Sequence, residues 1–460
     1  MLTPAAARGG ATGRVLFVAR EPDETLRTFL PVIDCLRERH GLASRVLFHH
    51  TPGEWARHEL ARRCVGTREV PLPDRGLGWA FLAHGGGSSS AARTVDEICR
   101  FWRARRLARN LLDCERPSAV VVIQDTLLLE RFLVRQANRL GLPTIVIQWA
   151  FSFPQALYDR LRSIQFAQSQ NDPGSAPSTL RRSLRPLTRA TYRAILAGLG
   201  LSFDLVNSYG GGEARIFAVM GEAFKEQYLA QGVRNKRVVV TGHPAHDAAH
   251  ARATSPSEGE RRATRERYGL PLDRPLVLYA TQPVLWRRVI GPAELRANVT
   301  AIADAVARAP GMPQLVLKLH PRERPEDYAF CEQLTPPVRL ISRADMADLI
   351  AASDAFISSS SSTVLLAMML ARPIVTINFN QVPHFDFFES IGGTLHTRTP
   401  DEFGQAIELA LGDEPTRKRL AQEQQAVLAR YAMFDGDATE RVAGLIVEAI
   451  AESGKLAGAA

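Results

Sequence analysis

A histidine followed by a proline and two arginines stands in the second half of the sequence. His320 ends an apolar run, residues 314–319, and Arg322 and Arg324 follow Pro321. Because proline has no N–H to donate, a strand over this run is expected to end there. A ring N–H and guanidinium groups at the carboxyl end of a strand are good donors to phosphate oxygens. The alternative is a strand-end histidine on a basic surface.

Five consecutive serines and a threonine join another apolar run to a predicted helix. Residues 357–363 read ISSSSST and lead directly into VLLAMMLA. The first turn of a helix leaves N–H groups unpaired and carries a partial positive charge, so small hydroxyl side chains there favour an anion site. Since one serine is enough to cap a helix, some of the others can be turn residues. The candidate donors are Ser360, Ser361, Ser362 and Thr363.

Two further predicted strands end in polar residues. Gln282 follows the apolar run 276–280, where it could hydrogen-bond a ligand or cap the next helix. The run 237–241 is followed by Gly242, His243 and Pro244, which make a tight exit from the strand. We expect these three residues to form a hinge beside a binding cleft, and a purely structural loop is the alternative.

Carboxylates follow two strands of the first half of the chain. Glu21 and Asp23 come after the first predicted strand, and Asp125 ends the apolar run 119–124. A carboxylate opposite a phosphate-binding face could act as general base for an acceptor hydroxyl. Asp125 is the preferred base because it ends a buried strand and is expected to point into the cleft. The alternative for Asp23 and Asp125 is capping of the helix that follows.

The elements that would position these residues alternate between short apolar strands and longer amphipathic helices. Such alternation predicts α/β architecture with parallel sheets covered on both faces. We expect two doubly wound Rossmann-like domains that face each other across a cleft, with ligands at the carboxyl ends of the strands. The first covers residues 13–250, with a basic helical insertion at about 160–205, and the second covers 271–435. Residues 251–270 read as a linker, and the helix at 436–460 could cross back to the first domain.

Composition narrows the class of protein. The 460 residues are 45% hydrophobic and carry 57 − 48 = +9 net charges, which suits a globular protein with an anionic partner. The five cysteines are scattered without zinc-type spacing, and no glycine-rich segment has the dinucleotide fingerprint. No metal and no cofactor are therefore expected. The absence of a long apolar run predicts a cytoplasmic protein, and a peripheral contact with the inner face of the cell membrane stays open.

A basic amphipathic segment at residues 180–201 is the candidate for that membrane contact. Its leucines can share one helical face while its arginines lie mostly elsewhere, which is typical of helices on anionic membranes. The alternative is an ordinary surface helix. Nucleic acid is not an expected partner, because the arginines are dispersed and are not interleaved with aromatic residues.

The order of these motifs resembles the GT-B glycosyltransferases, particularly bacterial capsule and cell-wall polymer enzymes. That group includes polysialyl- and Kdo-transferases, glycerophosphotransferases that use a CDP-linked donor, and the related UDP-N-acetylglucosamine 2-epimerases. The resemblance runs from about residue 14 to 430 and rests on VTGHPAHD, LVLKLHPRE and SSSSTVLLAMMLARPIV. It implies a nucleotide on the second domain. The residues that it implies at the donor phosphates are His320, Pro321, Ser361, Ser362 and Thr363.

The expected function is metal-independent transfer of a sugar or a polyol phosphate. The donor would be nucleotide-activated, and the acceptor would be a surface polysaccharide or a lipid-linked glycan. Two alternatives remain open. One is an enzyme like the UDP-N-acetylglucosamine 2-epimerases, which needs the same donor site but no acceptor. The other is a catalytically silent binding subunit, because Leu366 stands where many members of the group have a ribose-binding glutamate.

Overall fold

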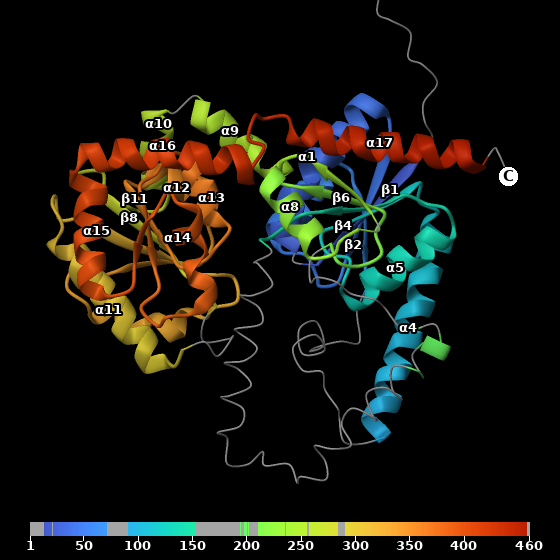
Figure 1. The fold of residues 1–460 in the computed structure, drawn as a ribbon, viewed down its shortest axis with the longest axis horizontal. Helices are drawn as coiled ribbons and strands as arrows, with labels where there is room; N and C mark the ends of the chain where they lie inside the picture. The colour runs from blue at the N-terminus through green and yellow to red at the C-terminus, as the bar shows by residue number, and fades with distance from the viewer. Residues whose placement is uncertain are drawn as a thin grey trace, which may run out of the picture. The chain divides into compact units, whose positions relative to one another are not determined.

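The computed structural model describes residues 13–20, 22–70, 91–151, 194, 197–199, 201, 210–234, 236–254, 257–283 and 290–457. The chain forms two compact units. Unit 1 consists of the described residues of Met1–Ser152, Arg162–Ala245 and Asp437–Ala460, and unit 2 consists of those of His246–Gly436. Each unit is built around one parallel sheet (Figure 1).

The sheet of unit 1 has seven described strands in the order β3-β2-β1-β4-β5-β6-β7. The strands are β1 (Arg14–Ala19), β2 (Ala43–Phe48), β3 (Gly66–Glu69), β4 (Ala119–Val122), β5 (Thr144–Ile147), β6 (Ile216–Val219) and β7 (Arg237–Val240). All pair in parallel, and Val15 of β1 lies between Ser44 of β2 and Ala119 of β4 in register. Every residue of β4 is buried, which is the pattern of a strand covered on both faces.

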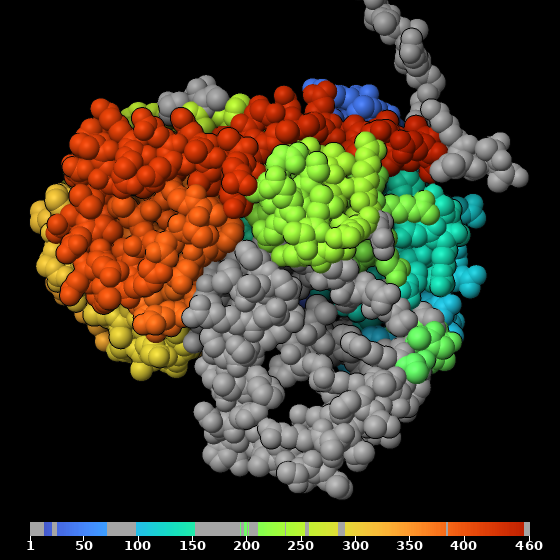
Figure 2. Space-filling model, in the orientation of Figure 1, coloured from blue at the N-terminus to red at the C-terminus, as the bar shows by residue number. Residues whose placement is uncertain are grey.

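Helices cover both faces of this sheet. They are α1 (Pro22–His40), α2 (Glu54–Arg62), α4 (Ala91–Glu115), α5 (Leu128–Arg139), α8 (Glu222–Ala230) and α17 (Ala438–Ala457). The last helix of the chain packs against α1, and Val442, Ile446 and Ala449 from α17 belong to the same apolar core as β1 and β4. α4 and α5 pack against each other. In Figure 2 the segment that includes α8, drawn in green, forms part of the surface of unit 1.

The sheet of unit 2 has six described strands in the order β10-β9-β8-β11-β12-β13. They are β8 (Leu276–Ala280), β9 (Gln314–Lys318), β10 (Arg339–Ile341), β11 (Ala355–Ser358), β12 (Ile374–Ile377) and β13 (Leu395–Thr397). All pairs are parallel. The first strand, β8, has β9 on one side and β11 on the other, so the strand order reverses beside β8.

Two helical layers sandwich the sheet of unit 2 (Figure 1). α11 (Pro292–Arg308) and α15 (Pro400–Gly412) pack together on one face, while α12 (Met346–Ala352) and α13 (Thr363–Met369) pack together with their neighbours on the other. The remaining elements are α9 (Asp247–Thr254), α10 (Glu258–Arg267), η2 (Pro325–Gln333), η3 (Pro383–Asp386), α14 (Phe387–Ile391) and α16 (Glu414–Tyr431), and η1 (Pro244–His246) spans the boundary between the units.

The described residues of 251–270 belong to unit 2 and do not form a linker. α10 packs on α12, and the buried Arg265 of α10 donates to the carbonyl oxygen of Ala352 at 3.0 Å and to Asp354 Oδ2 at 2.8 Å. The sequence prediction failed here because the charged composition of α10 suggested a solvent-exposed segment. Instead, Arg265 joins α10 to the residues that precede β11 through its hydrogen bonds.

Candidate functional site

The carboxyl edge of the unit 2 sheet brings three of the predicted segments together. In a doubly wound sheet, ligands bind beside the strand where the order reverses, which here is the edge between β8 and β11. Gln282 follows β8, His320 follows β9, and the serine run follows β11. Because β9 and β11 each lie one strand from β8, their ends are about 10 Å apart.

The His-Pro segment forms a tight turn at the end of β9. The N–H of Glu323 donates to the carbonyl oxygen of His320 at 2.9 Å, which closes the turn. The N–H of Arg322 donates to Nδ1 of His320 at 3.1 Å. With Nδ1 used as an acceptor, a neutral His320 ring carries its proton on Nε2. Both His320 and Arg322 are half-buried and Pro321 is exposed.

Glu323, which the sequence analysis did not select, fixes this turn. Its Oε2 accepts from the N–H of His320 at 3.0 Å and from the hydroxyl of Thr281, and its Oε1 accepts from the Tyr328 hydroxyl at 2.6 Å. Burial raises the pKa of the Glu323 carboxyl, and the hydrogen bonds that it accepts offset this effect only in part. The sequence signal was the position of Glu323 three residues after His320, the spacing that closes a turn.

The serine run is organised by Gln282. With its carboxamide oxygen turned toward the run, Gln282 accepts from the N–H of Ser361 at 2.7 Å and of Ser360 at 2.8 Å. The hydroxyl of Ser361 accepts from the N–H of Thr363 at 3.3 Å. These N–H groups, which we expected to face a phosphate, are thus occupied by side chains. The serine hydroxyls are what the run offers a ligand, because Ser360 and Ser361 are half-buried and Ser362 is exposed.

The predicted general base Asp125 does not fit that role. Its side chain is 0% exposed, and the ammonium of Lys236, itself 3% exposed, donates to its Oδ2 at 2.9 Å. Oδ2 also accepts from the N–H of Ala214 at 3.3 Å. The sequence correctly indicated a buried strand end, but this burial encloses the carboxylate inside unit 1 and leaves it no access to an acceptor.

The structure does not describe the side chains of the other two predicted carboxylates, Glu21 and Asp23. Asp23 lies in the first turn of α1, and its side chain is outside the described part of the structure, as is Glu21 altogether. The same applies to nearly all of the predicted basic insertion at 160–205.

The Gly-His-Pro segment, residues 242–244, lies near the end of the second chain segment of unit 1. Gly242 has φ +75°, a left-handed conformation that favours glycine. His243 is buried, and its Nε2 lies 3.4 Å from the Thr28 hydroxyl, while Pro244 begins η1. Since unit 2 starts at His246, the segment lies at the boundary between the two units.

Unit 1 contains a second buried charge pair that the sequence analysis missed. His49 follows β2, and its Nε2 lies 3.0 Å from Oε1 of Glu130 on α5, with 3% and 4% of the two side chains exposed. Burial alone would raise the pKa of Glu130, but the attraction of His49, the hydrogen bonds to the carboxylate and the charge of Arg20 together outweigh it, and the pKa lies below its usual value. A sequence gives no signal for a pair that is 81 residues apart and on different elements.

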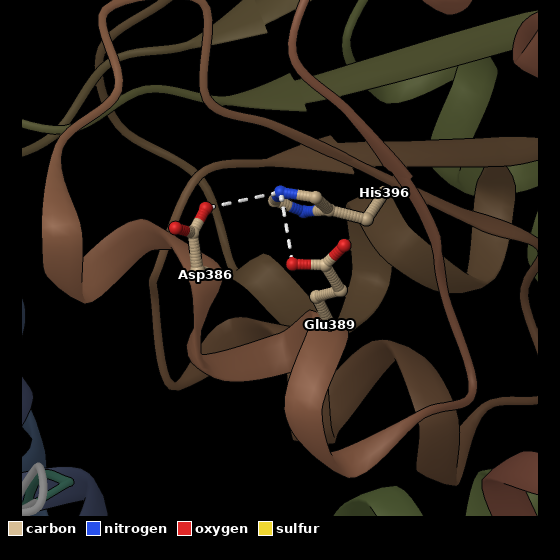
Figure 3. A group of neighbouring side chains, drawn as sticks. All are labelled: Asp386, Glu389 and His396. Atoms are coloured by element: carbon tan, nitrogen blue, oxygen red, sulfur yellow. Dashed lines mark hydrogen bonds and ion pairs between the residues drawn. The ribbon is translucent and has the colours of Figure 1, made fainter.

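A third polar cluster lies beyond β12 in unit 2 (Figure 3). The imidazole of His396 on β13 faces two carboxylates, with Nε2 3.2 Å from Asp386 Oδ1 and 4.0 Å from Glu389 Oε2. His396 Nδ1 lies 3.0 Å from the Thr376 hydroxyl. One histidine and two carboxylates within reach of one another could in principle hold a cation.

Arg398 already pairs with the carboxylates of this cluster. Its guanidinium donates to both carboxylate oxygens of Glu389, at 2.9 and 2.5 Å, and lies 3.6 Å from Asp386 Oδ1. That oxygen also accepts from Asn378 Nδ2 at 2.6 Å. A divalent ion would have to displace the arginine, so the arrangement is better described as an ion-pair network that joins β12, α14 and β13.

Similarity to solved structures supports the fold. A kitacinnamycin glycosyltransferase superposes with a TM-score of 0.59 at 15% identity over 96% of this chain and 100% of the other. The UDP-N-acetylglucosamine 2-epimerase of Neisseria meningitidis gives 0.55 at 14% over 95% and 100%. The wall teichoic acid polymerase TagF gives 0.54 at 13% over 96% and 90%. These matches confirm the prediction of a GT-B-like α/β fold. Comparison with curated proteins found no match.

A family profile identifies the chain more closely. Residues 218–448, half of the chain and all of the described part of unit 2, match the profile described as CDP-glycerol:poly(glycerophosphate) glycerophosphotransferase. No helix among the described residues is long and apolar enough to cross a membrane. The matched segment contains the His320 turn, Gln282 and the serine run. The chain therefore belongs to the CDP-glycerol:poly(glycerophosphate) glycerophosphotransferase family and is a transferase that uses a nucleotide-activated donor, and its fold is GT-B-like.

Proposed function

We propose that this protein transfers a polyol phosphate, or a sugar, from a CDP-linked donor to a hydroxyl group of a surface polysaccharide or lipid-linked glycan. The family supports the donor class. The observation that carries the assignment is the set of phosphate donors at the strand-order reversal of unit 2, where the His320 turn and the serine run flank β8. This is the position at which such a sheet binds nucleotides.

In this proposal the donor phosphates lie between the ends of β9 and β11. The Nε2–H of His320 and the guanidinium of Arg322 donate from one side, and the hydroxyls of Ser360, Ser361 and Ser362 donate from the other. Pro321 ends the strand, Gln282 holds the serine run in place, and Thr363 begins the helix behind it. Donors fixed in advance stabilise the charge that develops on a departing nucleotide, which is usually the largest electrostatic contribution to catalysis.

The proposed transfer needs no oxidant or reductant, because no atom changes its oxidation state. The acceptor oxygen forms a bond to the distal phosphorus of the donor, the bridging P–O bond breaks, and CMP leaves with the bridging oxygen. The acceptor proton passes to a base. Glu21 and Asp23 remain our candidates for that base, because Asp125 is committed to Lys236. For a sugar donor, the bond would form at the anomeric carbon and a nucleoside diphosphate would leave.

Three finer points belong to the same proposal. Gly242, His243 and Pro244 act as the hinge, a role supported by their place at the boundary between the units. The transfer is independent of divalent ions, since the Arg322 guanidinium supplies positive charge to the phosphates and His320 Nε2–H adds a hydrogen bond. The protein works in the cytoplasm at the inner face of the cell membrane, which it contacts through residues 180–201.

A thermal-shift panel of CMP, CDP, UDP, GDP and TDP tests the donor site. A ligand at about one hundred times its Kd stabilises the native state by about 2.7 kcal/mol, so the matching nucleotide should raise Tm by several degrees. His320→Ala and Ser361→Ala should reduce the shift, whereas Glu332→Ala on the exposed side of η2 should leave it unchanged. Equal shifts in all four proteins would remove the site assignment. Product analysis with UDP-N-acetylglucosamine alone distinguishes a transferase from a 2-epimerase.

A further inference from the structure

Glu323 is a half-buried carboxylate of unit 2 that no step of the transfer uses. Three donors from three elements converge on it: the N–H of His320 after β9, the hydroxyl of Thr281 after β8, and the hydroxyl of Tyr328 in η2. Tyr328 is 1% exposed. The carboxylate therefore lies directly beneath the edge to which we assign the donor phosphates.

The contacts between Glu323 and His320 are reciprocal. The N–H of Glu323 donates to the carbonyl oxygen of His320 at 2.9 Å, and the N–H of His320 donates back to Oε2 of Glu323 at 3.0 Å. This pair of bonds closes the turn in both directions. The bond from Arg322 N–H to His320 Nδ1, 3.1 Å, then orients the imidazole within the closed turn.

Thr281 connects the turn to the serine run. Its hydroxyl accepts from the N–H of His320 at 3.1 Å while it donates to Glu323. The next residue, Gln282, accepts from the N–H groups of Ser360 and Ser361. One chain of hydrogen bonds thus runs along the sheet edge from Tyr328 through Glu323 and Thr281, and it continues through the backbone to Gln282.

We propose that Glu323 is a positioning residue for donor binding, which holds the 320–323 turn so that His320 and Arg322 are in place before the nucleotide arrives. The inference rests on the proposed function, because it assigns Glu323 a role through the donor site. Pre-organised donors bind a phosphate more tightly than donors that must first be ordered. A carboxylate suits this role because it accepts from all three donors at once, whereas a carboxamide has a single accepting oxygen.

A double-mutant cycle on CDP affinity, measured by calorimetry well below each variant's Tm, tests the proposal. Glu323→Ala should weaken CDP binding at least tenfold. In a His320→Ala background, the same change should weaken it further by no more than about threefold, because Glu323 acts largely through that side chain and interacting residues are not additive. The matched control is Glu332→Ala, an exposed glutamate on η2, the element that follows the turn, and it should stay within twofold of the wild type.

The pH dependence adds a second readout. The groups that face the Glu323 carboxyl are Tyr328 and Asp327 from η2, Tyr279 from β8, and His320 in the turn. The ratio of wild-type affinity to Glu323→Gln affinity should rise with pH as the carboxyl ionises, because only the ionised form accepts from all three donors. The same ratio for Glu332→Gln should stay constant.

Each outcome decides the question. Glu323→Ala binding within twofold of the wild type, an additive loss in the double variant, or a flat affinity ratio for Glu323→Gln would overturn the positioning role. If Glu323→Ala does not fold, Thr281→Val removes one donor to the carboxylate, and its loss of affinity must also shrink in the His320→Ala background. If the wild type binds none of the five nucleotides, the proposed function itself fails and takes this inference with it.

Discussion

The buried ion pair between Asp125 and Lys236 is expected to stabilise unit 1 and to take no part in the transfer. Lys236→Met removes the ammonium and leaves a carboxylate that is 0% exposed. Its remaining hydrogen bond in the described structure is from the N–H of Ala214 at 3.3 Å, and the Arg131 guanidinium is close enough to attract it. Breaking a buried pair by removing one partner strands an uncompensated charge. The expected loss is about 3–5 kcal/mol of unfolding free energy.

The exposed pair between Lys225 and Glu222 is the matched control. It has an N–O distance of 3.4 Å, and 34% and 60% of its side chains are exposed. Solvent screens such a pair, so Lys225→Met should change the unfolding free energy by about 1 kcal/mol or less. Urea unfolding followed by hydrogen exchange would measure both variants. Peptides from β4 and β7 report on unit 1, and peptides from β9 and β11 report on unit 2.

The double variant Asp125→Asn/Lys236→Met distinguishes a structural role from a catalytic one. Removing both charges should recover most of the lost stability, because the cost lies in the stranded charge and not in the absence of the pair. The double variant should also retain transferase activity. Wild-type stability with abolished activity in Asp125→Asn would refute this reasoning and restore Asp125 as the base.

Three further predictions follow from the structure. The pKa of Glu130 is lower in the folded state than the unfolded value of about 4.5. Its contribution to the unfolding free energy is therefore present above that unfolded value and is lost as the pH falls through the folded value. In urea unfolding at several pH values, the unfolding free energy of Glu130→Gln should approach that of the wild type in acid. Gly212→Ala would place a methyl group 2.3 Å from the carbonyl oxygen of Asp125, so chemical denaturation should show that the unfolding free energy falls by about 1–3 kcal/mol. Gly259→Ala is the control, because no atom lies nearer than 3.5 Å to the added methyl group, and its unfolding free energy should rise by up to about 1 kcal/mol. If residues 180–201 contact anionic membranes, the protein should co-sediment with phosphatidylglycerol vesicles at low salt and not at high salt, and equal pelleting of a variant with three of these arginines changed to glutamate would contradict the prediction.

Much of the fold could be predicted from the sequence because apolar strand runs alternate with helical patterns. The order of such runs in a doubly wound sheet indicated that His320, Gln282 and the serine run share one edge, which the strand order of unit 2 supports. These are consequences of local periodicity and of general topology, and both can be read without knowing any side-chain contact.

What could not be predicted depends on contacts between distant residues. Asp125 and Lys236 are 111 positions apart, so the sequence showed a buried carboxylate but not the lysine that occupies it. Arg265 lies in a charged segment that the sequence suggested was a linker, and its hydrogen bonds to Asp354 and to the carbonyl oxygen of Ala352 have no local sequence signal. Glu323 acquires its role from hydroxyl groups on two other elements, which no local pattern specifies.

A structure of the protein with CDP bound would show whether the His320 turn and the serine run hold the donor phosphates. We expect both phosphates to lie at the edge between β9 and β11, within hydrogen-bond distance of His320 Nε2 and of at least one hydroxyl of Ser360, Ser361 or Ser362. A nucleotide bound elsewhere, or with its phosphates turned away from His320 and the serine run, would contradict it.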